Sequence, residues 1–334
     1  MNVLVLGATG YVGSRLATLL RESGWARPVE ASSRARGEGQ VRVDVRDGAA
    51  LAQALRGMDA VVNCVAGDAA SIAEGARLLA QAAATARCAR VIHLSTMSVY
   101  GAREGVVDEN AEPGPLLGWY DRAKREAEQS LLGYTAAGGT LVMLRPGCVW
   151  GPGSELWVDR VGRWLRSSRL GDLGEGGDGW SNLVHVDDVC LATLRALQLP
   201  LAPGASRVYN LAAPDSPRWN EYFMDLALAI GATPVRRLGP RRLALDARVA
   251  GPVLHVARKV LQRAGRVAKV IPAPITPGLL GVWQRQLHMD ARAAARDLML
   301  DWTPYPVALS EAAAWFVRQE SLERVKSHAA FIPG

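Results

Sequence analysis

The stretch NVLVLGATGYVG (residues 2–13) joins a near-continuous apolar run to a turn with three glycines. Such a run is typical of a strand buried on both faces of a parallel sheet. Glycines at this spacing allow a tight turn and a close approach of the backbone to a pyrophosphate, and the following helix offers free N–H groups. We therefore expect a dinucleotide site here rather than an ordinary glycine-rich turn, formed by Gly7, Thr9, Gly10, Tyr11, Val12 and Gly13.

Short β-rich runs alternate with helical patterns through the first 150 residues. Further strands are expected at 28–33, 41–45, 60–66, 90–95 and 140–145. Helical patterns occur at 11–23 and near 49–56, 71–86 and 119–133. Strand, helix and strand at this spacing predict an α/β fold, a Rossmann-type doubly wound parallel sheet.

The pattern changes after about residue 150, where Gly and Pro become frequent and helices dominate. A strand is expected at 208–213 and helices at 219–230, 242–264 and 308–320. We predict an NAD(P)-binding domain over 1–150, with returning segments near 180–213, and a smaller, helix-rich substrate lobe over most of 151–334.

The composition excludes several classes of protein. The 334 residues are 49% hydrophobic and 21% charged, which excludes a disordered chain and a collagen-like repeat. The sequence has no signal-peptide pattern and no apolar run of about 18 residues, so we expect a cytoplasmic protein without a membrane-spanning helix. The four cysteines form no CxxC and the five histidines show no ligand spacing, so we expect reduced thiols and no metal.

The formal net charge of +7 comes from one segment. Residues 236–269 hold ten basic residues and one acid, a net of +9, which leaves about −2 for the rest. We therefore expect no nucleic-acid partner. Within this segment, 242–264 is either a helix that makes weak contact with a membrane surface or, as we favour, an ordinary amphipathic helix with a solvated basic face.

The end of the second strand selects between NAD and NADP. An acid about 20 residues beyond the last glycine would bind the ribose hydroxyls, but this sequence has Ser33, Arg34 and Arg36. Arginine suits a 2′-phosphate, so NADP(H) is preferred, with NAD(H) as the alternative. Asp44 and Val45 follow the third strand and are candidates for the adenine edge, and Ala66 follows the fourth, near the nicotinamide ribose.

Tyr120 and Lys124 are four residues apart in a helical stretch and so share one face. Tyrosine normally ionises near pH 10, but a nearby ammonium and the positive nicotinamide of an oxidised cofactor favour the tyrosinate. Thr96 closes the fifth strand and is placed to bind a substrate oxygen. Together these residues could transfer a proton while the cofactor moves a hydride.

These pieces resemble the extended short-chain dehydrogenases/reductases, the NAD-dependent epimerase/dehydratase superfamily. The matching segments are GATGYVG (7–13), DVRD (44–47), STMSVYG (95–101), YDRAK (120–124), RPGCVWGPG (145–153) and HVDDV (185–189). The resemblance implies that Thr96 is the catalytic hydroxyl with Ser98 as its helper, and that Tyr120 and Lys124 are the YxxxK pair. It also implies that Pro146 brackets the nicotinamide and that the protein is a homodimer through helices near 71–86 and 119–133.

Departures from the family pattern bear on the reaction. The 4,6-dehydratases carry an Asp-Glu pair where this sequence has Met97 and Ser98. Sugar-nucleotide epimerases carry diphosphate-binding Asn and Arg where this sequence has Cys148 and Ser181. The C-terminal layout is similar to the branch of 3β-hydroxysteroid dehydrogenases. We therefore expect an oxidoreductase that interconverts a secondary alcohol and a ketone on an apolar small molecule. The alternatives are a nucleotide-sugar epimerase with retained cofactor and a non-catalytic NADP(H)-binding protein.

Overall fold

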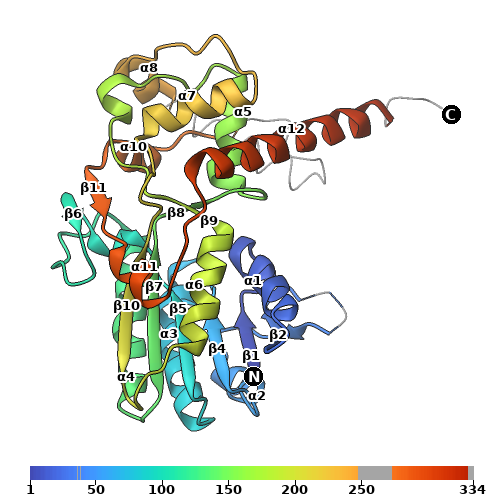
Figure 1. Ribbon diagram of the computed structural model, residues 1–334, viewed down its shortest axis with the longest axis vertical. Coiled ribbons are helices and arrows are strands. Elements are labelled where there is room, and N and C mark those ends of the chain that lie inside the picture. The colour runs from blue at the N-terminus through green and yellow to red at the C-terminus, as the bar shows by residue number, and fades with distance from the viewer. Residues whose placement is uncertain (36, 38, 247–272, 330–334) are drawn as a thin grey trace. The chain divides into compact units, whose positions relative to one another are not determined.

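A computed structural model describes residues 1–35, 37, 39–246 and 273–329 of the chain (Figure 1). The chain divides into two compact units. Unit 1 contains Met1–Gly147, Val184–Pro214 and Met289–Trp302, and unit 2 contains Cys148–Leu183, Asp215–His288 and Thr303–Gly334. The sequence prediction included the return near 180–213 but not the return at Met289–Trp302. Most of the predicted helix 242–264 lies outside the described residues, as does Arg36.

Unit 1 is built on seven parallel strands in the order β10-β7-β5-β4-β1-β2-β3, which confirms the predicted doubly wound sheet. The strands are β1 (Asn2–Leu6), β2 (Arg27–Ser32), β3 (Val41–Arg42), β4 (Ala60–Asn63), β5 (Arg90–Leu94), β7 (Thr140–Pro146) and β10 (Ser206–Leu211). The short strand β6 (Gly105–Val107) lies outside this sheet. The third strand was expected at 41–45, but in the structure it is only two residues long, Val41–Arg42.

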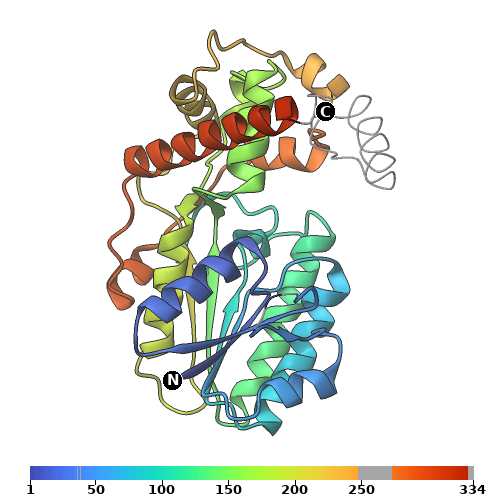
Figure 2. The same cartoon turned by 90° about the vertical axis from the view of Figure 1, so that its right-hand side faces the viewer.

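Helices cover both faces of this sheet, as Figure 2 shows. Helix α1 packs against α6 on one face, while α3 packs against both α2 and α4 on the other. The helices are α1 (Tyr11–Glu22), α2 (Gly48–Ala54), α3 (Ala69–Thr85), α4 (Trp119–Thr135), α6 (Val186–Gln198), α11 (Arg292–Asp297) and the 3-10 helix η1 (Met97–Tyr100). Strand residues such as Leu4, Val61 and Val91 have no exposed surface, because both faces of the sheet are covered.

Unit 2 is mainly helical and has an aromatic core. Its elements are β8 (Cys148–Trp150), the π-helical turn η2 (Glu155–Asp159), α5 (Arg160–Arg166), the 3-10 helix η3 (Gly174–Gly177), α7 (Trp219–Ala229), α8 (Pro240–Leu245), α10 (Pro277–Gln284) and α12 (Tyr305–Ala329). Strands β9 (Leu183–His185) and β11 (Leu287–Met289) each cross a boundary between units. Among the described residues, no helix combines the length and the apolar character needed to span a membrane.

Tryptophans make up much of the unit 2 core. Trp150 and Trp164 are almost completely buried: Trp150 stacks on Tyr305 with ring centroids 5.6 Å apart, and the indole Nε1 of Trp164 donates to Ala273 O at 2.7 Å. Within unit 2, these two fill the core.

Candidate active site

The glycine-rich turn lies at the carboxyl end of β1. Gly7 has φ of +79°, and a Cβ at this position would lie 2.9 Å from the carbonyl oxygen of Cys64, at the end of neighbouring β4. A Cβ on Gly13 would overlap the carbonyl oxygen of Gly7. The turn therefore accepts only glycine at these two positions, because the backbone approaches itself too closely for any side chain.

This turn lies where the strand order reverses, with β2 on one side of β1 and β4 on the other. Ligands of open parallel sheets bind at such switch points. Helix α1 begins at Tyr11 without a side-chain cap on its N-terminus, whereas Asp47 caps α2 and Asp68 caps α3. The free first-turn amides and the glycine backbone fit a pyrophosphate. The residues predicted to bind the dinucleotide, from Gly7 to Gly13, thus lie on this turn and on the first residues of α1.

Two segments predicted to hold the adenosine end follow β2 and β3. The Thr9 hydroxyl lies 2.7 Å from the Ser32 hydroxyl, so the glycine turn is joined directly to the end of β2. Ser33 and Arg34 follow with exposed side chains.

Asp44 lies beyond the short strand β3, and its carboxylate forms an ion pair with a residue close by in the chain. The Arg46 guanidinium donates to both carboxylate oxygens, at 3.1 and 2.9 Å. These bonds lower the pKa of Asp44 to about 2. Val45 packs so closely on Gly75 of α3 that a Cβ there would lie 2.8 Å from its side chain. Ala66 is exposed after β4, and buried Pro146 ends β7.

The catalytic candidates lie at the same edge of the sheet as the glycine turn. Leu6 of β1 is in register with Asn63 of β4, and Asn63 with His93 of β5. The chain then continues from β5 to Thr96, whose hydroxyl accepts from the Ser98 N–H at 3.2 Å and begins η1. The strand register therefore brings the turn and the Thr96–Ser98 segment to neighbouring strand ends.

Helix α4 carries Tyr120 and Lys124 on one face, and both are largely enclosed. The Tyr120 side chain lies near that of Thr96, which acts to lower its pKa. Burial raises the pKa of Tyr120 by more than the neighbouring Thr96 lowers it. Lys124 is 3% exposed, and its ammonium donates to Leu94 O at 2.8 Å, two residues before Thr96 in the chain. The structure therefore brings together Thr96, Tyr120 and Lys124, the three side chains that the sequence singled out.

Burial lowers the pKa of Lys124 to about 8, although Cys64 and Glu128 act in the opposite direction. The thiol of Cys64 stays neutral because burial raises its pKa to about 12. His93 on β5 is also buried, and its Nδ1 lies 3.2 Å from Asn63 Nδ2. Burial keeps the pKa of His93 well below the ordinary value. With a pKa of about 8, Lys124 is still mostly protonated at pH 7.

Sequence reasoning missed a buried polar network that connects α4 to the sheet. Arg145 on β7 forms a two-pronged ion pair with Glu128 of α4 and also donates to the Tyr100 hydroxyl at 3.0 Å. The Tyr100 hydroxyl in turn donates to Asn210 Oδ1 at 2.6 Å. In the sequence, Arg145 stands out only as the first residue of the motif RPGCVWGPG (145–153). The spacing of Tyr120, Lys124 and Glu128, two steps of four on one helix, indicates that Glu128 shares their face, but it does not identify Arg145 as its partner.

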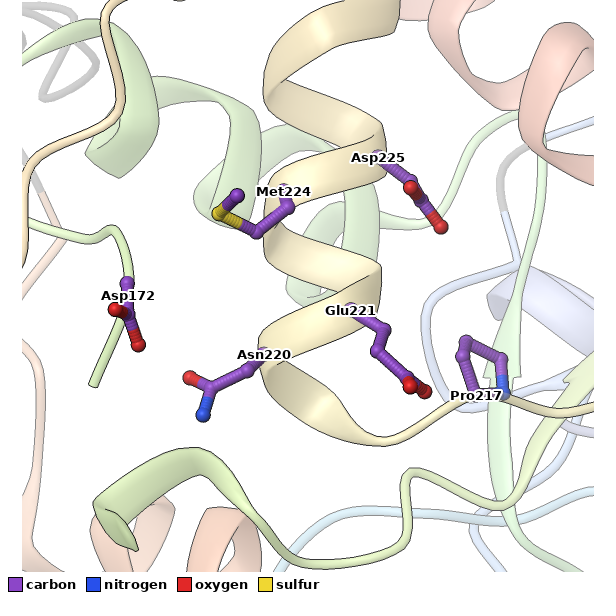
Figure 3. A pocket seen from close by; sticks show the side chains of 6 residues that line it. All are labelled: Asp172, Pro217, Asn220, Glu221, Met224 and Asp225. Atoms are coloured by element: carbon purple, nitrogen blue, oxygen red, sulfur yellow. The ribbon is translucent and has the colours of Figure 1, made fainter. Parts of the chain in front are cut away.

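In unit 2, a shallow cavity of about 580 Å³ borders α7 (Figure 3). Its polar groups already have structural partners. Asn220 accepts from Leu173 N at 3.0 Å and donates to Gly174 O at 2.7 Å, while Asp225 accepts from the Tyr305 hydroxyl at 2.9 Å. Glu221 accepts from the Arg218 N–H. These contacts hold α7 against its neighbours, so this cavity is no candidate for the chemistry.

The two positions that distinguish epimerases are also in unit 2. Ser181 is completely buried, and its hydroxyl lies 2.8 Å from that of Ser216. Cys148 is buried too, and its backbone N–H donates to Asn182 O at 2.9 Å. Neither side chain carries a charge or a free amide to offer a diphosphate.

Comparison with known proteins places the chain in one family. Residues 3–212 match the model of the NAD dependent epimerase/dehydratase family. A 2-alkyl-3-oxoalkanoate reductase of Stenotrophomonas maltophilia (strain K279a) is 29% identical over 254 residues, 70% of this chain and 76% of the relative. A 3-diazoavenalumate denitrifying reductase of Streptomyces sp is 28% identical over 335 residues, 91% and 96% of the two chains.

Among solved structures, MoeE5 in complex with UDP-glucuronic acid and NAD superposes with a TM-score of 0.72. It is 24% identical, and the match covers 96% of this chain and 100% of that one. This likeness supports the fold. The family match covers more than half of the chain, and it includes the glycine turn and the Thr96, Tyr120 and Lys124 segments. The protein is an enzyme of the NAD dependent epimerase/dehydratase family.

Proposed function

We propose that this enzyme is an NADP(H)-dependent oxidoreductase that interconverts a secondary alcohol and a ketone on an apolar small molecule. The observation that carries the proposal is that Thr96 lies close enough to Tyr120 to lower its pKa, with buried Lys124 four residues further on the same helix. A tyrosine beside a hydroxyl side chain and followed by a buried lysine is suited to deliver a proton to a carbonyl oxygen or remove one from an alcohol.

The residues of unit 1 have separate roles in this proposal. The Gly7–Gly13 turn would bind the pyrophosphate, and Ser33 and Arg34 the 2′-phosphate. Lys124 would hold the nicotinamide ribose and stabilise the tyrosinate by its charge. Thr96, supported by Ser98, would orient the substrate oxygen toward Tyr120. The nicotinamide cofactor would supply or accept the hydride. Unit 2 would contribute the substrate lobe.

The neutral, buried Cys148 and Ser181 favour a substrate without a diphosphate. The reductase relative supports the reduction of a ketone, because a 2-alkyl-3-oxoalkanoate is a keto acid with apolar alkyl chains. A homodimer stays a prediction from the family resemblance, and a cytoplasmic location stays a prediction from the sequence pattern.

The test is a comparison of the Tyr120→Phe variant with the parent on pools of lipophilic ketones and of nucleotide sugars, each with NADPH, analysed by mass spectrometry. We expect the parent to add two hydrogens to a ketone with matching NADPH consumption, and Tyr120→Phe to lower this rate at least about a hundredfold. Unchanged turnover in the variant would contradict the mechanism. A nucleotide sugar converted to an isomer without NADPH consumption would instead identify an epimerase.

A further inference from the structure

An apolar ledge directly precedes the candidate acid/base. Leu116, Leu117 and Trp119 are 38%, 62% and 57% exposed, and Tyr120 follows at once. The surrounding heptapeptide, PGPLLGW at 113–119, contains no ionisable side chain. Three large exposed apolar residues within four consecutive positions are unusual on a protein surface and indicate a binding function.

The ledge is held by a specific set of hydrogen bonds. The Arg125 guanidinium donates to Val99 O and to Gly114 O, both at 2.6 Å. Ala102 N donates to Pro115 O at 2.8 Å. The backbone just before the ledge is therefore tied to η1, the segment that begins with Thr96.

The other end of the ledge is fixed to α4. Leu117 N donates to a carboxylate oxygen of buried Asp121 at 2.9 Å, which closes the turn before the helix. A surface held on both sides keeps its shape when a ligand binds, so little ordering entropy is lost.

Trp119 contacts the candidate acid/base directly. The rings of Trp119 and Tyr120 lie edge to face, with centroids 5.7 Å apart and an angle of 83° between planes. A molecule that covers the exposed part of Trp119 is therefore adjacent to Tyr120. Because the ledge is uncharged, it suits an aliphatic or aromatic group rather than a phosphate or a sugar.

We propose that Trp119, flanked by Leu116 and Leu117, is the platform on which the apolar part of the substrate lies, and that it sets the preference for apolar substrates. This inference rests on the proposed reduction of a ketone. It adds the surface that recognises the part of the substrate remote from the reacting oxygen.

The experiment measures kcat/KM with NADPH for straight-chain methyl ketones from 2-butanone to 2-undecanone. In the parent, kcat/KM for the longest ketone should be much higher than kcat/KM for the shortest. Trp119→Ala should lower the ratio of these two values about tenfold. Trp119→Phe, which keeps an aromatic ring, should retain most of it. The matched control is Leu132→Ala, because Leu132 is an equally apolar, 43% exposed residue of α4 more than three turns away.

A second readout separates the platform from the reaction. Saturation-transfer NMR measures the binding of 2-undecanone to the NADP-loaded enzyme without turnover. Weaker binding of 2-undecanone in Trp119→Ala but not in Leu132→Ala would support the platform. If the parent reduces no ketone, the proposed reaction is overturned, but this binding result would still support the platform. Binding and chain-length ratio both unchanged in Trp119→Ala would overturn the platform. A change in native mass in that variant, with ketone binding intact, would show that the ledge contacts a second copy instead.

Discussion

Arg145 of β7 and Glu128 of α4 face each other as a two-pronged ion pair, with Nε–Oε1 at 2.9 Å and Nη2–Oε2 at 2.7 Å. Their side chains are only 12% and 9% exposed. Glu128 lies one helical step of four beyond Lys124, which itself lies one such step beyond Tyr120. The pair therefore fixes the rotation of the helix face that carries the candidate catalytic groups, and connects that face to β7 of the sheet.

We predict that Glu128→Gln lowers the free energy of unfolding by about 3–5 kcal/mol, because it leaves the Arg145 guanidinium buried without its counter-charge. Urea unfolding at pH 7 measures this change. Glu74→Gln is the control, since Glu74 forms a similar two-pronged pair with Arg77 at the exposed surface of α3. The control should change stability little, because solvent screens an exposed pair. Equal losses in the two variants would show that burial of the Arg145 pair has no energetic consequence.

The second prediction concerns pH. The pKa of Lys124 falls from the ordinary 10.5 to about 8 in the folded enzyme, chiefly because of burial. Between these two values the unfolded chain binds more protons than the folded chain, so this residue makes stability rise with pH across that window. Below pH 8 the folded enzyme carries the full cost of the buried charge.

Lys124→Met removes this titration. We expect the stability of the cofactor-free parent, relative to Lys124→Met, to increase by about 3 kcal/mol between pH 7 and pH 10.5, the equivalent of a shift of about 2.5 pKa units. Urea unfolding at several pH values follows the difference. Arg122→Met is the control, because Arg122 is exposed on the same helix and arginine stays charged throughout. A difference between parent and Lys124→Met that does not vary with pH would contradict the assignment.

The local parts of the site could be predicted from the sequence. The run at 2–13 indicated a strand, a glycine turn and a helix, and the structure has β1, Gly7 and α1 in that order. The spacing of Tyr120 and Lys124 predicted a shared helix face. Both predictions depend on residues close together in the chain, where periodicity and turn chemistry act directly.

Features that depend on distant residues could not be predicted. The partners of Arg145 come from Glu128, Tyr100 and Glu109, on three separate segments, and no local pattern joins them. Segment Met289–Trp302 returns to unit 1 through a two-turn helix too short to show a periodic pattern. The third strand ended early, and Asp44 beyond it forms an ion pair with Arg46 two residues away.

The third prediction concerns the choice of cofactor. Arg34 follows β2 with an exposed side chain, so it is available to pair with a 2′-phosphate. Arg34→Ala should lower kcat/KM for NADPH about tenfold while leaving that for NADH nearly unchanged, because only NADPH carries the charged group. Steady-state kinetics with each cofactor measures the effect. Arg27→Ala, at the opposite end of the same strand, should leave both values unchanged. A parent enzyme that prefers NADH, or an equal loss with both cofactors, would contradict the role of Arg34.

The last prediction compares two glycines that both lie inside helices. A Cβ on Gly13 of α1 would overlap the carbonyl oxygen of Gly7, whereas a Cβ on Gly133 of α4 would meet nothing within 4 Å. Gly133→Ala should therefore stabilise the protein by about 0.5–1 kcal/mol, since alanine restricts the unfolded chain and favours a helix. Gly13→Ala should push α1 away from the turn and weaken NADPH binding at least about tenfold, because the amides at the start of α1 would no longer converge on the pyrophosphate. Thermal unfolding with and without NADPH measures both effects. The stabilisation by NADPH should persist in Gly133→Ala and be reduced in Gly13→Ala; equal stabilisation in the two variants would show that the close approach at Gly13 does not shape the nucleotide site.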